Sequence, residues 1–399
     1  MKITRVKCHV LMAPECSKSL NTASDDAVVE VHTDTGLTGI GEVESNPWVI
    51  WAAIERSGAH SMDRRLADLL IGQDPRQPAA MWEYLYEQSQ LAGRRGAGIG
   101  AIGAVDMALW DIAGKAAGKP VWQLLGELQS ESVGAYASLL PSGGTLKDYR
   151  ESLLAKAQWA RDAGFSAVKI EILIKGPLRV AGLDESDDTI VDLVAAGREV
   201  VGPEVQLMID VGYCWRDWKE ARQVFRRLEK HELYFIETPL WSDDLHGYAR
   251  LADSTSIRIA AGELLSTRFE FVELMDVGKV HVVQPDVGRV GGISEAMRVA
   301  AMAADRGILV VPHCWKSGIG IAATAHVAAA LPNCPLIEFL PAAVSESRLR
   351  KELVIDELQV ENGRIPLPKV PGLGIELNRS VVTEFAEFAH RHSAGSAVD

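Results

Sequence analysis

The stretch after about Val133 constrains the fold most, because short apolar runs alternate there with longer amphipathic segments. Trp218–Lys230 and Ile293–Asp305 are two of the segments with a helical pattern. Strands that alternate with helices form parallel βαβ units, and eight such units close into a (β/α) barrel of the TIM type. We therefore expect an α/β fold with barrel strands at Gly134–Ser138, Ala167–Ile172, Gln206–Ile209, Tyr234–Ile236, Ile257–Ala260, Val280–Val283, Leu309–Val311 and Leu336–Ile337.

The first part of the chain has a different pattern, which indicates an α+β segment. Alternating apolar residues predict strands at Ile3–Met12, Ala27–Thr33 and Thr38–Val43. Helical spacing predicts helices at Val49–Leu70, Gln77–Gln90 and Ala97–Ala117, and a last helix near Arg379–His392. We expect residues 1–130 to form this α+β segment, residues 131–352 the barrel, and residues 353–399 to return to the first segment.

Charge and cysteine content exclude several classes of function. The 399 residues carry a formal net charge of −13, and such an acidic surface argues against binding to nucleic acid or to anionic membranes. The five cysteines form no CxxC pair, which is typical of reduced thiols in the cytoplasm. We expect neither a signal peptide nor an apolar run of transmembrane length. The sequence therefore predicts a cytoplasmic protein.

Polar residues recur where the predicted barrel strands end. Consecutive members of the series lie 23 to 27 residues apart, which is about one βα unit each. The carboxyl ends of parallel barrel strands share one mouth, where active sites of this fold lie, so we expect these side chains to converge. The series consists of Asp210, Glu237, Glu263, Asp286, His313 and Glu338.

The first three members of the series place three carboxylates together. Asp210, Glu237 and Glu263 would repel one another strongly unless a cation neutralised them. Ligation by oxygen alone favours a hard ion, and Mg²⁺ keeps positions open for water or substrate. Single acids at strand ends also cap helices or lie in solvent. Three acids in register favour a Mg²⁺ site.

Asp286 and His313 follow neighbouring predicted strands. An aspartate that accepts a hydrogen bond from an imidazole orients the ring and favours its charged form, which suits a general base. A histidine after an apolar strand is often structural when it stands alone. Beside three carboxylates, the pair is interpreted as a catalytic dyad.

Six ordered motifs run along nearly the whole chain: TDTGLTGIGE (Thr33–Glu42), AVDMALWDIAGKAAGKPVWQLLGE (Ala104–Glu127), AVKIE (Ala167–Glu171), QPDVGRVGGISEA (Gln284–Ala296), PHCWKSGIG (Pro312–Gly320) and IEFLP (Ile337–Pro341). With these motifs and the acid series, the chain resembles the enolase superfamily, specifically its mandelate-racemase-like members. This resemblance implies an α+β capping domain over a modified barrel, Mg²⁺ held by Asp210, Glu237 and Glu263, and a catalytic Asp286–His313 dyad. It also implies that Glu338 contacts the carboxylate side of the enediolate.

The second barrel strand departs from the pattern of many relatives, which carry Lys-x-Lys there. Lys169 matches the first lysine, and the resemblance implies that it contacts the metal-bound substrate carboxylate. Glu171 occupies the second position, where two-base racemases need a base on the other face of the intermediate. We expect Glu171 to be ionised and weakly basic near the metal ligands. Two roles stay open for it, a second base and an ion pair with Lys169 or Lys175.

Loops of the capping domain are expected to set specificity. The candidates are Pro14–Ser24, Ser45–Trp48 and Gly93-Arg94-Arg95-Gly96, and Arg95 is predicted to bind substrate through its fork of donors. A solvated loop arginine is the alternative. Trp315, two residues after His313, is expected either to face the pocket or to pack in the core.

One base favours syn dehydration of a sugar acid to a 2-keto-3-deoxy acid, with His313 taking the α-proton and protonating the departing β-hydroxyl. This function requires Mg²⁺ and a small-molecule carboxylate substrate. A racemase, epimerase or cycloisomerase is the second hypothesis, and a non-catalytic binding protein with the same barrel is the third. We also expect a homo-oligomer.

Overall fold

In the computed structural model, which describes residues 1–14, 24–60 and 64–393, all eight predicted barrel strands form one parallel sheet. The order is β10-β9-β8-β7-β6-β5-β4-β11. The two ends of the sheet are joined by a 3.3 Å hydrogen bond from the Glu338 amide to the Pro312 carbonyl. The strands are β4 (Ser132–Leu139), β5 (Ala167–Glu171), β6 (Gln206–Asp210), β7 (Ile236–Glu237), β8 (Ile259–Ala261), β9 (Val282–Val283), β10 (Leu309–Val310) and β11 (Ile337–Phe339).

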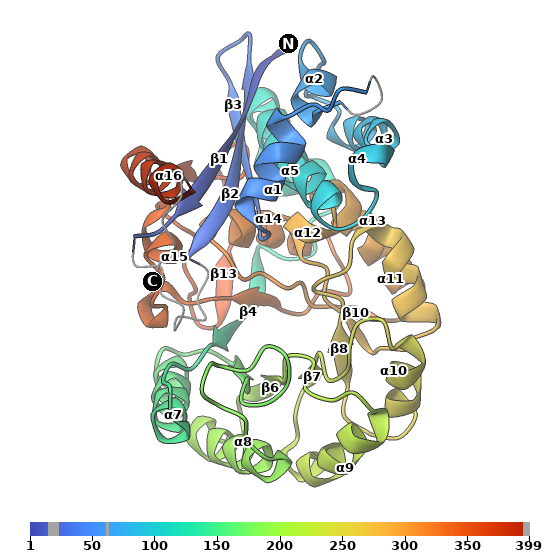
Figure 1. The fold of residues 1–399 in the computed structure, drawn as a ribbon, viewed down its shortest axis with the longest axis vertical. Coiled ribbons are helices and arrows are strands. Elements are labelled where there is room, and N and C mark those ends of the chain that lie inside the picture. The colour runs from blue at the N-terminus through green and yellow to red at the C-terminus, as the bar shows by residue number, and fades with distance from the viewer. Residues whose placement is uncertain (15–23, 61–63, 394–399) are drawn as a thin grey trace.

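Helices follow these strands and cover the outside of the sheet (Figure 1). Several begin at a residue whose side chain accepts a hydrogen bond from the first turn, namely Thr145, Ser186, Asp217, Asp244 and Ser317. The helices are α7 (Leu146–Asp162), α8 (Asp187–Val201), α9 (Trp218–Leu228), α10 (Leu245–Ala252), α11 (Thr267–Asp276), α12 (Val287–Val290), α13 (Ile293–Ala304), α14 (Gly318–Ala329) and α15 (Arg348–Glu352).

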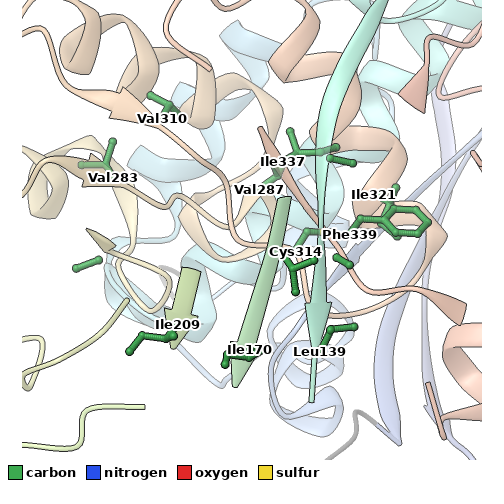
Figure 2. Close-up of a cluster of buried hydrophobic side chains, with 14 of the residues drawn as sticks. Leu139, Ile170, Ile209, Val283, Val287, Val310, Cys314, Ile321, Ile337 and Phe339 are labelled. Atoms are coloured by element: carbon green, nitrogen blue, oxygen red, sulfur yellow. The ribbon is translucent and has the colours of Figure 1, made fainter. Parts of the chain in front are cut away.

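Alternation along the strands separates the barrel interior from its outer face. Residues such as Ile170 and Ile209 belong to the large apolar cluster between the strands and the helices, part of which Figure 2 shows. The strand residues on either side of Ile170 and Ile209 therefore point inward. A smaller interior cluster draws on all eight barrel strands or their flanks: Tyr136, Ala167, Met208, Phe235, Ala260, Val282, Val311 and Leu336.

The N-terminal segment forms an antiparallel sheet that lies against its own helices above the barrel (Figure 1). Gly39 and Gly41 let β3 approach α5 closely, since a Cβ at Gly39 would lie 1.9 Å from the Ala108 carbonyl oxygen. The elements are β1 (Ile3–Met12), β2 (Asp25–Thr33), β3 (Thr38–Val43), α1 (Pro47–Glu55), α2 (Leu66–Leu70), α3 (Pro78–Gln88), α4 (Gln90–Gly93), α5 (Ala97–Ala117) and α6 (Trp122–Leu125).

Two expectations for this segment were wrong. The single helix predicted over Val49–Leu70 is broken, because α1 ends at Glu55 and Arg56 is extended. An apolar run of transmembrane length does exist, in α5, whose mean hydropathy reaches 1.3. However, 83% of that window is buried inside the protein, between the N-terminal sheet and the barrel. The apolar composition of α5 is therefore that of a buried core helix.

The C-terminal segment contacts both other parts of the chain. β13 (Arg364–Pro366) pairs antiparallel with β4, and β12 (Val354–Ile355) pairs with β14 (Glu376–Leu377). The last helix, α16 (Arg379–Ser393), packs against β1 as Figure 1 shows. The division of the chain into 1–130, 131–352 and 353–399 stays a prediction.

Candidate active site

Three carboxylates meet at the carboxyl ends of β6, β7 and β8. One oxygen from each of Asp210, Glu237 and Glu263 lies within 4.8 Å of the others, and all three residues are buried. Strand alternation places two of them, because Asp210 stands two residues after the inward Met208 and Glu237 two after the inward Phe235. The structure therefore brings the three predicted metal ligands together.

The chemistry of this cluster fits a divalent cation. Oε1 of Glu237 is buried without a hydrogen-bond partner among the described residues, while Oε2 accepts a 2.9 Å bond from Lys169. Burial raises the pKa of Glu237 to about 8, and the Asp210 charge adds to the shift while Lys169 opposes it. Burial also raises the pKa of Glu263. A bound cation would offset the cost of burying these charges.

His313 and Asp286 form the predicted pair beside this cluster. Nδ1 of His313 lies 2.8 Å from Oδ2 of Asp286, whereas Nε2 lies 3.3 Å from Oε2 of Glu263 and 3.9 Å from Oε2 of Glu338. Burial disfavours the imidazolium, but the Glu338 charge and the Asp286 hydrogen bond outweigh it and raise the pKa of His313 to about 10. The hydrogen bond to Asp286 therefore fixes the orientation of the imidazole, and Nε2 points towards Glu263 and Glu338.

Lys169 links the strand ends across the barrel. Its ammonium lies 2.8 Å from Oε1 of Glu338, 2.9 Å from Glu237 and 3.4 Å from Glu171. Oε2 of Glu338 accepts the Cys314 amide at 2.8 Å. These contacts hold Glu338 beside the cluster.

Glu171 lies buried beside the acid cluster, and its ionised, weakly basic state stays a prediction. Burial raises the pKa of Glu171 well above its ordinary value; Lys169 opposes the shift, and the nearby Asp210 and Glu237 charges add to it. Oε1 of Glu171 accepts a 3.1 Å bond from Ser138. Of its two predicted partners Lys169 is the neighbour, whereas Lys175 pairs with Asp187 at 2.8 Å.

The site opens into a cavity of about 920 Å³. Trp315 lines it, as one of the two interpretations predicted, whereas Lys316 turns away and donates to the Asp25 carbonyl at 2.6 Å. Arg95 is not among the described residues that line the cavity. It lies 3.4 Å from Glu270, which does line it. This placement does not support direct substrate binding by Arg95, and most of the loop Pro14–Ser24 lies outside the described residues.

Sequence reasoning assigned no role to three residues at the site. Arg289 joins the cap to the barrel, because Nη2 lies 2.6 Å from Glu44 and Nη1 donates to the Glu263 carbonyl at 3.2 Å. Tyr213 and Thr238 donate to carboxylates of the cluster.

An α+β cap over a (β/α) barrel, with acids on successive strand ends, is the architecture of enolase-type enzymes. Residues 4–126 match the mandelate racemase / muconate lactonizing enzyme N-terminal domain, and residues 152–381 match the enolase C-terminal domain-like family. The chain belongs to the mandelate racemase / muconate lactonizing enzyme branch of the enolase superfamily.

Its relatives are acid-sugar dehydratases and cycloisomerases. The D-galactarolactone cycloisomerase of Agrobacterium fabrum is 32% identical over 96% of this chain and 99% of its own length. The arabinonate dehydratase of Saccharolobus solfataricus is 34% identical over 89% of each chain.

Solved structures of the family have the same fold. The 3,6-anhydro-D-galactonate cycloisomerase of Zobellia galactanivorans superposes with a TM-score of 0.84, at 28% identity over 96% of this chain and 99% of that one. A racemase from Streptomyces coelicolor A3(2), solved with bound magnesium, gives a TM-score of 0.80, at 26% identity over 96% of this chain and 99% of that one.

Proposed function

We propose that this chain is a Mg²⁺-dependent sugar-acid dehydratase. The enzyme removes the proton α to the carboxylate, expels the β-hydroxyl as water on the same face, and releases a 2-keto-3-deoxy acid after the enol becomes a ketone. One observation carries the proposal: three carboxylates converge within 4.8 Å, and His313 lies 3.3 Å from one of them. The acid-sugar relatives support the substrate class.

The cluster of Asp210, Glu237 and Glu263 would hold the metal. When bound, Mg²⁺ supplies positive charge that stabilises the enediolate and favours the neutral form of His313. Lys169 and Glu338 lie 2.8 Å apart and orient the substrate carboxylate. A preorganised donor such as the Lys169 ammonium lowers the barrier because the second negative charge develops where it already points.

His313 performs both proton transfers in this scheme. Asp286 holds Nδ1, so Nε2 takes the α-proton, and the resulting imidazolium returns it to the departing β-hydroxyl. The proton taken from carbon thus leaves in the water, and the electron pair of the C–H bond becomes the C–C double bond of the enol. No second base is required.

An isomerase is the second hypothesis, and one observation favours it. Glu171 lines the same cavity as His313, so it stands where a second base could reach the substrate. A base on each face of the intermediate would permit racemisation, epimerisation or cycloisomerisation.

The test compares two conservative variants in D₂O after pentonates and hexonates have been screened for 2-keto acid formation. His313→Asn should lower turnover by about 10²–10⁴-fold or more and abolish exchange of the substrate α-proton, because it removes the general base. Glu171→Gln should retain this exchange. Proton NMR measures the exchange in both variants. Exchange that survives in His313→Asn but not in Glu171→Gln makes Glu171 the base, and exchange that survives in both favours the isomerase.

The remaining expectations belong to the same proposal. An enzyme of this kind acts in the cytoplasm on a small-molecule carboxylate, without nucleic acid or membrane as a partner, and assembles as a homo-oligomer. Elution volume with light scattering measures the assembly state directly.

A further inference from the structure

Two loops at the barrel mouth hold non-glycine residues in the left-handed region of backbone space. Tyr213, after β6, has φ of 59°, and Thr238, after β7, has φ of 45°. A left-handed conformation is a rare outlier for a β-branched or bulky residue and costs on the order of 1–3 kcal/mol. The two are joined directly, because the Tyr213 amide donates to the Thr238 carbonyl at 2.7 Å.

Each of these residues donates its hydroxyl to a different carboxylate of the cluster. Thr238 donates to Oδ1 of Asp210 at 2.6 Å, and Tyr213 donates to Oε1 of Glu263 at 2.6 Å. Oδ1 of Asp210 also accepts the Gly212 amide at 2.8 Å. Both donors are buried, with 0% of Thr238 and 6% of Tyr213 exposed.

The hydroxyls engage one oxygen of Asp210 and one of Glu263, and leave the other oxygen of each facing charged groups of the site. Oδ2 of Asp210 lies 4.0 Å from the Lys169 ammonium, and Oε2 of Glu263 lies 3.3 Å from Nε2 of His313. Oε1 of Glu237 is open, since Lys169 binds Oε2. Each carboxylate can therefore offer a single oxygen, and its rotation is fixed by a donor on the other one.

We infer that Tyr213 and Thr238 are positioning residues for the metal site. They act on the cation indirectly, because their hydroxyls fix the rotation of the Asp210 and Glu263 carboxylates. This inference rests on the proposed metal site. Each hydroxyl reaches a carboxylate that follows another strand of the barrel, and the shared backbone hydrogen bond joins the two loops. Donors that orient metal ligands typically contribute about 10–100-fold to metal affinity.

The experiment measures MgCl₂ binding to the full chain by titration calorimetry after removal of metal by EDTA and dialysis. Thr238→Val and Tyr213→Phe keep the shape of each side chain and remove the hydroxyl, and each should weaken Mg²⁺ binding by about 10–100-fold. Thr238→Ser keeps the donor and should restore affinity to within a few-fold of the unaltered protein.

A matched control separates positioning from general stability. Tyr248 is equally buried and donates to the Leu240 carbonyl at 2.6 Å, in the same loop region but not to an acid. Tyr248→Phe should lower the urea midpoint in EDTA yet leave Mg²⁺ affinity unchanged.

The outcomes separate the inference from the proposed function. If the unaltered chain binds Mg²⁺ and both hydroxyl-free variants bind it equally well, the inference is overturned and the metal site stands. If the unaltered chain binds no Mg²⁺, the metal site and the inference fall together. Should Thr238→Val fail to fold in EDTA, Tyr213→Phe decides the matter alone.

Discussion

One buried imidazole should make the stability of this protein depend on pH. His326, on α14, is 0% exposed and joins two distant segments of the chain. Nδ1 accepts the Trp122 amide at 3.1 Å, and Nε2 lies 3.1 Å from the Leu373 carbonyl. Only the neutral ring with its proton on Nε2 satisfies both contacts, because a proton on Nδ1 would face another N–H group.

Burial lowers the pKa of His326 to about 4, although the Leu373 carbonyl opposes the shift. In the unfolded chain a histidine has a pKa of about 6.5. Between pH 6.5 and pH 4 the histidine is therefore protonated in the unfolded chain but not in the folded protein. The free energy of unfolding falls as the pH decreases below 6.5. The loss reaches about 2 kcal/mol at pH 5 and about 3 kcal/mol near pH 4.

His326→Gln removes this titration. We expect the unaltered chain to have a higher free energy of unfolding in urea than the variant at pH 7.5. This difference should shrink by about 2 kcal/mol when the pH is lowered from 7.5 to 5. His246→Gln, which changes an exposed histidine on α10, is the control for the effect of replacing a histidine that is not buried. A difference for His326→Gln that stays constant over this range would refute the reasoning, because it would mean that the folded protein accommodates the charged ring.

Two further predictions concern the metal and the packing of the cap. Glu237→Gln should remove most of the rise in melting temperature that MgCl₂ produces, because one anionic ligand is lost; an unchanged rise in thermal scans would exclude Glu237 as a ligand. Gly103→Ala should lower the free energy of unfolding, measured in urea, by about 1–3 kcal/mol, since its Cβ would lie 2.1 Å from the Gly288 carbonyl oxygen. Gly144→Ala, whose Cβ meets nothing within 4 Å, is the control, and equal midpoints for the two variants would contradict the prediction.

The barrel and its series of acids could be predicted because both depend on periodicity alone. Strand alternation fixes which residues face inward, and the βα repeat fixes where each strand ends. Asp210 and Glu237 follow from these two rules, and Glu338 follows in the same way between Ile337 and Phe339 of the outer cluster. No contact between distant side chains had to be known.

Properties that depend on three-dimensional neighbours could not be predicted in the same way. The pKa of Glu171 is set by burial among acids from β6 and β7, and no local pattern reports that environment. Arg95 was interpreted from residue type, yet the fold places it against Glu270. The left-handed backbone of Thr238 gives no signal in composition, and so its hydrogen bond to Asp210 was missed.

Glu42 shows why one of the matching motifs has its particular residues. Its carboxylate, at the end of β3, accepts the Ser317 hydroxyl at 2.5 Å, the Ser317 amide at 3.2 Å and the Gly320 amide at 2.6 Å. These groups begin α14, where a negative charge is favoured by the helix dipole. A Cβ at Gly320 would lie 2.7 Å from Oε1 of Glu42, so the glycine of one motif makes room for the acid of the other.

This contact joins the cap to the loop that carries the proposed base. His313 stands four residues before Ser317, and Lys316 between them binds the Asp25 carbonyl of β2 at 2.6 Å. Two strands of the cap therefore hold the chain directly after His313, while Asp286 holds the imidazole itself. The cap, which was expected only to set specificity, also fixes where the base stands, because the loop that follows the base has its hydrogen bonds in the cap.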